Sequence, residues 1–102
     1  MIGFHPDALA EIERARDWYE EKRPGLGADL VDEIERSLAR LGEGPMSFAR
    51  APESRAARRA LLSRFPYWLV FVVLDNEDLL IVALAHARRS PGYWRGRVAR
   101  SR

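Results

Sequence analysis

The sequence predicts an α+β domain of two layers, in which a helical hairpin covers one face of an antiparallel-rich sheet. At 102 residues the chain is long enough for one hydrophobic core and too short for two. Apolar residues recur at helical spacing in the first part of the chain, up to residue 41. Two β-branched and aromatic runs, 67–74 and 79–86, then flank a short polar turn, which is typical of a buried β-hairpin.

The first elements follow from the proline at position 6. Residues 1–5 are apolar and predict a short edge strand, because Pro6 would block a longer one. A helix is expected over residues 7–22, where Pro6 and Asp7 suit the first turn. Its apolar positions recur every three or four residues: Ala8, Ile12, Ala15 and Tyr19.

A second helix is predicted over residues 26–41, after the helix-breaking Arg-Pro-Gly at 23–25, with Gly42 as its stop. So short a break predicts an antiparallel helical hairpin, with Trp18 and Tyr19 packing against the start of the second helix. The apolar stripe of this helix comprises Leu26, Leu30, Ile34, Leu38 and Leu41.

The second half of the chain predicts three strands. Residues 42–52 contain two glycines and two prolines and predict a loop, and a strand is expected over 58–64 because a two-stranded hairpin needs a third strand for stability. After His86 the chain turns at Ser90-Pro91-Gly92, and one short helical turn is expected from Tyr93. We expect a single domain over residues 1–98 and a disordered basic tail over 99–102.

Charge is unevenly distributed along the chain. Residues 1–45 hold 11 acidic and 6 basic residues, a net charge of −5, whereas residues 46–102 hold 4 acidic residues and 11 arginines, a net charge of +7. Such asymmetry indicates a nucleic acid or an acidic protein as the partner. The absence of cysteine excludes disulfides and thiolate metal sites. With no signal-peptide pattern and no apolar run near ~20 residues, a cytoplasmic protein without a membrane partner is expected.

Three stretches together resemble a known family in order and spacing. They are residues 4–27, with FHPDA at 4–8, DWYEE at 17–21 and RPGLG at 23–27; RFPY at 64–67; and AHARRSPGYW at 85–94. The chain resembles the RelE/ParE toxin superfamily, the toxin half of type II toxin–antitoxin (plasmid stabilization) modules, and its ParE-like branch more than its RelE-like branch.

The resemblance implies a cognate antitoxin whose C-terminal segment wraps the toxin and neutralises it, and no cofactor. ParE-type members act on DNA gyrase and stall replication, whereas RelE-type members cleave messenger RNA on the ribosome without a metal. One fold serves both targets, so the site must decide between them. The leading hypothesis is a ParE-like toxin that arrests growth by binding gyrase and has no catalytic centre of its own. The alternatives are a ribosome-dependent endoribonuclease and an inactive relic that only binds the antitoxin.

The nuclease hypothesis depends on His86 and Arg64, whose positions resemble catalytic residues of some nuclease members. His86 would act as acid or base and Arg64, with Arg59, would hold phosphate. Supporting roles would fall to Tyr67, Tyr93 or Glu53. The chain departs from the nuclease pattern after residue 95, which weakens this hypothesis. In the structural alternative, His86 caps the sheet with a hydrogen bond, and Arg64 pairs with a helix carboxylate, Asp29 or Asp32.

Arginine and aromatic residues in the second half are the candidate contacts with the target or the antitoxin. Together they suit stacking on nucleic acid or binding to an acidic protein surface. In the alternative, Tyr93 and Trp94 anchor the tail to the sheet. No metal site is expected, since His5 and His86 lie far apart in sequence without a ligand cluster. The candidates are Arg58, Arg59, Arg64, Arg88, Arg89, Tyr93, Trp94 and Arg95.

Overall fold

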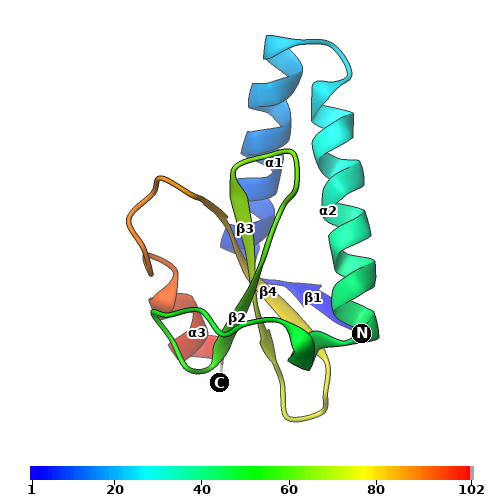
Figure 1. Cartoon of the computed structure of the whole chain (residues 1–102). Helices are drawn as coiled ribbons and strands as arrows, with labels where there is room; N and C mark the ends of the chain where they lie inside the picture. Colours follow the sequence, from blue (N-terminus) through cyan, green and yellow to red (C-terminus); the bar gives the residue numbers. More distant parts are fainter. Residues whose placement is uncertain (102) are drawn as a thin grey trace.

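The computed structural model describes residues 1–101, with side chains up to Val98. It confirms the predicted α+β class and the predicted order of elements (Figure 1). In chain order the elements are β1 (Ile2–Phe4), α1 (Pro6–Lys22), α2 (Leu26–Glu43), the 3-10 helix η1 (Pro45–Ser47), β2 (Ala57–Leu61), β3 (Tyr67–Val73), β4 (Leu79–His86) and α3 (Arg95–Ser101).

The four strands form one sheet in the order β1-β4-β3-β2. The β2–β3 and β3–β4 pairs are antiparallel, and β1 runs parallel to β4 at the edge. In the β3–β4 hairpin Tyr67 lies opposite His86, and the register shifts by a bulge between Val70 and Phe71. The antiparallel-rich sheet and the N-terminal edge strand are therefore confirmed.

The helices α1 and α2 run antiparallel and lie side by side (Figure 1). They approach closely at Gly27, where a Cβ atom would lie 2.6 Å from the carbonyl oxygen of Arg16. Gly25 supplies the turn between them with φ of 90°, a left-handed conformation that other residues rarely adopt. The Glu20 carboxylate accepts the N–H groups of both glycines, which fixes the connection.

Buried side chains lie on both faces of the sheet. The face toward the hairpin packs Leu69, Phe71 and Ile81 against helix residues such as Leu30. The other face packs strand residues including Val70, Val72 and Val82 against Trp94 and Val98 from the C-terminal segment. This segment therefore adds a small layer of its own to the two predicted layers.

Several predicted boundaries were wrong. The strand expected over 58–64 ends at Leu61, because the following backbone leaves the sheet and its N–H groups at Ser63 and Arg64 bind the Glu33 carboxylate. Gly42 does not stop α2, which continues to Glu43 and ends with Gly44 as its cap.

Two further expectations differ from the structure. Trp18 is 52% exposed rather than packed, while its neighbour Tyr19 contacts Phe65 and Tyr67 edge to face. Helix α3 begins at Arg95, two residues after the predicted start, and its backbone is helical to Ser101.

Side chains from residue 99 on and Arg102 lie outside the described part of the chain, so the basic tail over 99–102 stays a prediction. None of the described helices has the length and apolar character needed to cross a bilayer.

Candidate functional site

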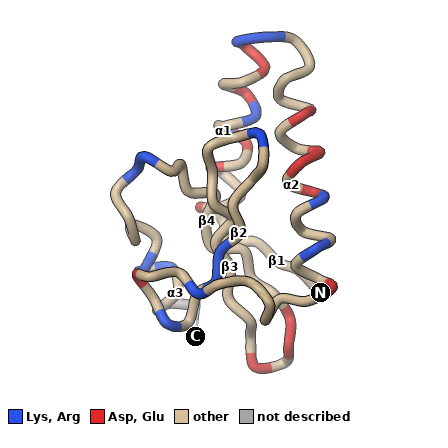
Figure 2. The backbone as a smooth tube through the Cα atoms, viewed as in Figure 1, with Lys and Arg blue, Asp and Glu red and all other residues tan. Residues whose placement is uncertain are grey.

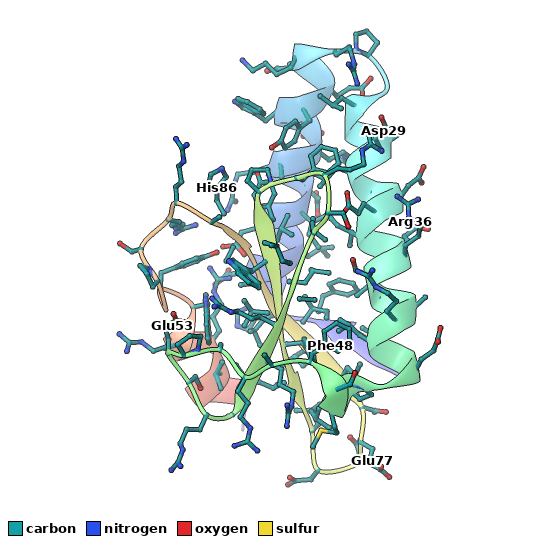
Figure 3. All side chains as sticks on the ribbon, viewed as in Figure 1. Asp29, Arg36, Phe48, Glu53, Glu77 and His86 are labelled. Carbon is teal, nitrogen blue, oxygen red and sulfur yellow. The ribbon has the colours of Figure 1, made fainter. Side chains whose placement is uncertain are left out.

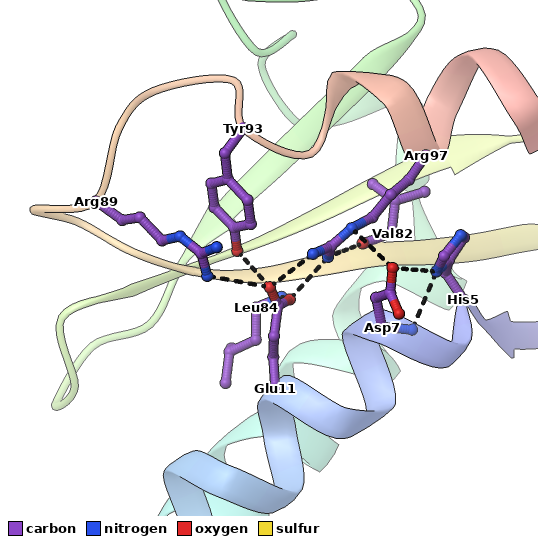
Figure 4. A network of polar contacts seen from close by, with 8 residues as sticks. All are labelled: His5, Asp7, Glu11, Val82, Leu84, Arg89, Tyr93 and Arg97. Carbon is purple, nitrogen blue, oxygen red and sulfur yellow. Dashed lines mark hydrogen bonds and ion pairs between the residues drawn. The ribbon is translucent and has the colours of Figure 1, made fainter.

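A buried carboxylate holds the C-terminal segment against the sheet. Glu11 lies on the buried side of α1, between Ala8 and Ala15, and is only 6% exposed. Its Oε1 accepts the backbone N–H of Leu84 in β4 at 3.1 Å, and its Oε2 accepts the Tyr93 hydroxyl at 2.7 Å (Figure 4). One side chain of α1 thus binds both the sheet and the segment that follows it.

Arg97 of α3 completes this cluster. Its two Nη atoms each lie 3.0 Å from a carboxylate oxygen of Glu11, and Nη1 also donates to the Val82 carbonyl at 2.9 Å. Asp7 lies 3.7 Å from its Nε, and Arg89 lies 3.5 Å from Glu11. Burial lowers the pKa of Arg97, but the hydrogen bond and charge of Glu11 outweigh it and raise that pKa overall.

Tyr93 stays neutral in this cluster. Burial, and then the hydrogen bond to Glu11, raise the pKa of its phenol well above the usual value. The guanidinium of Arg89 stacks 3.6 Å from the centre of the Tyr93 ring. The loop between β4 and α3 is therefore fixed at its base, and Arg88 and Arg89 are exposed on it.

Sequence reasoning missed Glu11, although the pattern of α1 contains a signal for it. Glu11 stands three residues after Ala8 and four before Ala15, so it occupies a position of the apolar stripe. A buried carboxylate requires hydrogen-bonding or charged partners. The pattern could have indicated the burial, but not that the partners come from the end of the chain.

His86 lies at the end of β4, where the sheet meets the C-terminal loop (Figure 3). Its Nδ1 accepts the backbone N–H of Arg88 at 3.0 Å, and its ring packs edge to face on Tyr67 at 5.1 Å between centres. Burial and the neighbouring Tyr19 raise the pKa of Tyr67 to about 12. The hydrogen bond considered as the structural alternative for His86 is thus present.

Arg64 lies elsewhere, beside α2. Its guanidinium is 3.4 Å from Asp29, one of the two partners considered, and its backbone N–H binds Glu33. It lines a cavity together with Ser37 and Arg40 of α2. His86 lines two other cavities, and Arg64 is part of neither.

A small cavity instead gathers a different set of the predicted residues beside His86. It measures about 80 Å³, and its lining includes Glu53, Arg59, Arg89 and Tyr93. Arg59 stacks over the Trp68 ring at 3.8 Å, and the Glu53 side chain lies against Gly92, where a Cβ atom would come within 3.0 Å of it. Figure 3 shows Glu53 beside the C-terminal segment.

Three other predicted contacts, Trp94, Arg58 and Arg95, are placed differently. Trp94 is 3% exposed and packs in the core, which confirms the anchoring alternative for it and leaves its ring unavailable to a partner. Arg58 and Arg59 point to opposite sides of β2, as neighbours in a strand do. Arg58 donates to the Phe48 carbonyl at 2.6 Å, and exposed Arg95 donates to the Gly92 carbonyl at 3.2 Å.

The segregation of charge along the sequence is also a segregation in space. Figure 2 shows acidic residues along the hairpin and at the β3–β4 turn, and arginines along β2 and the C-terminal loop. Among the residues whose positions are described, no three His, Asp or Glu side chains gather where they could hold a metal ion. Guanidinium groups therefore supply most of the exposed charge of the second half, whereas its described aromatic rings are half-buried or buried.

Comparison with known proteins adds family information to this geometry. A family model described as the ParE toxin of type II toxin-antitoxin system, parDE, matches residues 2–91. A chain from the chromosomal ParDE TA system of P. aeruginosa is similar in structure, with a TM-score of 0.74 and 20% identity over 85% of this chain and 95% of that one. The isolated E. coli RelE toxin gives 0.64 and 20% over 100% and 98%. No curated protein matches the sequence. At this identity the two structures share the fold.

Proposed function

Because this chain belongs to the ParE toxin family of type II toxin–antitoxin systems, we propose that it inhibits DNA gyrase by binding it. A cognate antitoxin neutralises it in this proposal, and both act in the cytoplasm. The half-buried Arg58 and Arg59 of β2 and the exposed Arg88 and Arg89 of the C-terminal loop form the contact surface. Acidic residues of either partner would pair with them, consistent with the +7 charge of residues 46–102.

The different surroundings of Arg64 and His86 support the choice of binding over catalysis. RNA cleavage without a metal needs an acid or base and a phosphate-holding group within reach of one phosphodiester. Here Arg64 is paired with Asp29, and His86 accepts a backbone hydrogen bond beside a different cavity. Binding to gyrase requires only a complementary surface, and it does not require Arg64 and His86 to lie close together.

One observation favours the endoribonuclease as a second candidate. The small cavity brings Arg59, His86, Glu53 and Tyr93 together. Arg59 would hold the phosphate, His86 would act as acid or base, and Glu53 and Tyr93 would support it. Its volume of about 80 Å³ is far below the ~300 Å³ at the lower end of ligand pockets, so a nucleotide would not enter without movement of the loop. This limit keeps the nuclease in second place.

The toxin proposal is tested by inducing the protein in bacteria with and without the neighbouring open reading frame. We expect growth arrest without that frame and recovery with it. No arrest under either condition would refute activity as a toxin and leave the relic hypothesis.

The target is tested in two assays run side by side. Purified gyrase should lose supercoiling activity when the protein is added, and primer extension on translated messages should show no new cleavage sites. We expect the His86→Ala variant to stay toxic. Loss of toxicity in that variant, together with cleavage sites made by the wild type, would instead support the nuclease.

The contact surface is tested with a matched pair of exposed arginines. Arg88→Glu should weaken gyrase inhibition, because it reverses a charge on the proposed surface. Arg23→Glu at the tip of the hairpin reverses a charge that is also exposed but lies outside that surface, and it should have little effect. Equal effects of the two variants would contradict this placement.

A further inference from the structure

A second cationic site lies at the end of the sheet where β2 begins and β3 turns toward β4. A cavity of about 650 Å³ opens there. None of its lining residues belongs to the set around His86, and Arg58 alone was among the sequence candidates. The lining comprises Met46, Arg50, Arg55, Ala56, Arg58, Val72, Val73, Leu74, Asp75 and Asn76.

Three guanidinium groups surround this cavity without ion-pair partners. Among residues 1–98, no carboxylate lies within ion-pair distance of Arg50, Arg55 or Arg58. Arg58 is held in place by its 2.6 Å hydrogen bond to the Phe48 carbonyl, whereas Arg50 and Arg55 are exposed. Asp75 is the single acid in the lining. A cleft with an excess of one charge concentrates ligands of the opposite charge.

The floor of the same cavity is apolar. Ala57, the first residue of β2, pairs with Val72, so Val73 extends beyond the end of its neighbour and has no partner in β2. Val73 and Leu74 are only partly buried, and the Met46 side chain at the cavity is 63% exposed. Apolar surface left open beside a ring of charges is typical of a protein-binding site.

The outer edge of β2 is not available for strand addition. The Arg59 N–H donates to the Ala49 carbonyl at 3.1 Å, and the Ala51 N–H donates to the Ala57 carbonyl at 2.8 Å. A ligand must therefore bind through side chains. A phosphodiester backbone would satisfy the arginines but would leave Met46 and Val73 uncovered.

We propose that this cavity binds an acidic, amphipathic segment of a partner protein. Its carboxylates pair with Arg50, Arg55 and Arg58, and an apolar side chain between them covers Met46 and Val73. Arginine binds carboxylates with two parallel hydrogen bonds, which gives such a contact direction as well as charge. The inference does not depend on the process that the protein inhibits, because it is tested by a binding assay alone. Arg58 is the one arginine that this cavity shares with the proposed contact surface.

The test is a fluorescence anisotropy titration of the full-length protein with a labelled 12-residue peptide built from the repeat Glu-Leu-Glu-Ser. The double variant Arg50→Ala/Arg55→Ala should raise the Kd about tenfold, since it removes two charge-assisted contacts. The control, Arg23→Ala/Arg36→Ala, removes two exposed arginines from the hairpin and should change the Kd by less than about twofold. Both variants change the net charge equally, and circular dichroism checks that both fold.

A second comparison separates peptide from nucleic acid. Met46→Gln should weaken binding of the peptide but not of a version with serine in place of leucine, since only the first has apolar side chains to lose. A labelled 12-nucleotide single-stranded DNA should be affected equally by the two double variants. No peptide binding, equal weakening by both double variants, or a loss confined to DNA in Arg50→Ala/Arg55→Ala would overturn the proposal.

Discussion

Arg97 and Glu11 stand 86 positions apart in the sequence and meet in a two-point ion pair, with 3.0 Å between each Nη and its carboxylate oxygen (Figure 4). The Glu11 side chain is 5% exposed and that of Arg97 is 13% exposed. Because Glu11 also binds the Leu84 N–H of β4, this pair joins the first helix and the last helix across one strand. The candidate surface around His86 depends on that joint, since the loop carrying Arg88 and Arg89 lies between β4 and α3.

Replacing Glu11 by glutamine should destabilise the fold. The change removes the closer and more buried of the two carboxylates that face Arg97, leaving Asp7 at 3.7 Å, and breaking a buried pair in this way costs about 3 kcal/mol. Urea unfolding of Glu11→Gln measures the free energy. Glu13→Gln, which alters an exposed acid of the same helix, should have no comparable effect. Similar midpoints for the two variants would show that the pair does not hold the segment.

Glu33 of α2 holds the loop between β2 and β3 in a similar way. It is 4% exposed and accepts the backbone N–H groups of Ser63 and Arg64. Glu33→Gln should cost about 1.5 kcal/mol in urea unfolding, because charge-assisted hydrogen bonds are replaced by weaker ones. The Ser63 and Arg64 amides should also exchange faster with solvent. The neighbouring exposed acid provides the control, Glu35→Gln, and unchanged exchange in Glu33→Gln would contradict the role.

Trp94 and Trp18 are a matched pair for testing the second core. Trp94 is 3% exposed and Trp18 is 52% exposed. Trp94→Ala should cost ~3 kcal/mol or more, as large-to-small changes in a core do, whereas Trp18→Ala should cost less than about 1 kcal/mol. Thermal unfolding checks both. If Trp18→Ala were the more damaging change, the packing of the C-terminal segment would be wrong.

Stability should fall in alkaline solution between about pH 10 and pH 12. Burial and the neighbouring Tyr19 raise the pKa of Tyr67 from 10.0 to about 12, so the folded protein retains a proton that the unfolded chain loses. This contribution is complete below pH 10 and is lost as the pH rises through about 12. Tyr67→Phe has no proton to lose and should show a smaller decline in its urea midpoint over this window. Identical pH profiles would contradict the assignment.

The elements and their order could be predicted because their signals are local. The stripe containing Leu30 and Ile34 specifies a helix face, and the β-branched runs around the turn at 75–78 specify the hairpin. The boundaries that failed were set by contacts outside the element. The strand expected to reach Arg64 ends at Leu61, since Glu33 binds the backbone that follows it.

The candidate site was only partly predictable. Its residue types followed from the excess of arginine and aromatic residues in the second half, and Arg59, His86, Arg89 and Tyr93 do gather at one cavity. Arg64, which only the nuclease alternative placed beside His86, lies at another. Because a strand was predicted over 58–64, the alternation of side chains along it could already have placed Arg58 and Arg59 on opposite faces.

The sequence by itself determined the class of fold, the helical hairpin, the sheet and the segregation of charge, because periodicity and composition are properties of neighbouring residues. The tertiary structure decided which tryptophan is buried, which arginines line the 650 Å³ cavity, and which acid binds Arg97. The burial of Trp94 and the pairing of Arg97 depend on the side of the sheet to which the end of the chain returns. Burial then makes each choice energetically large, because a charge removed from water must find its partner within the protein.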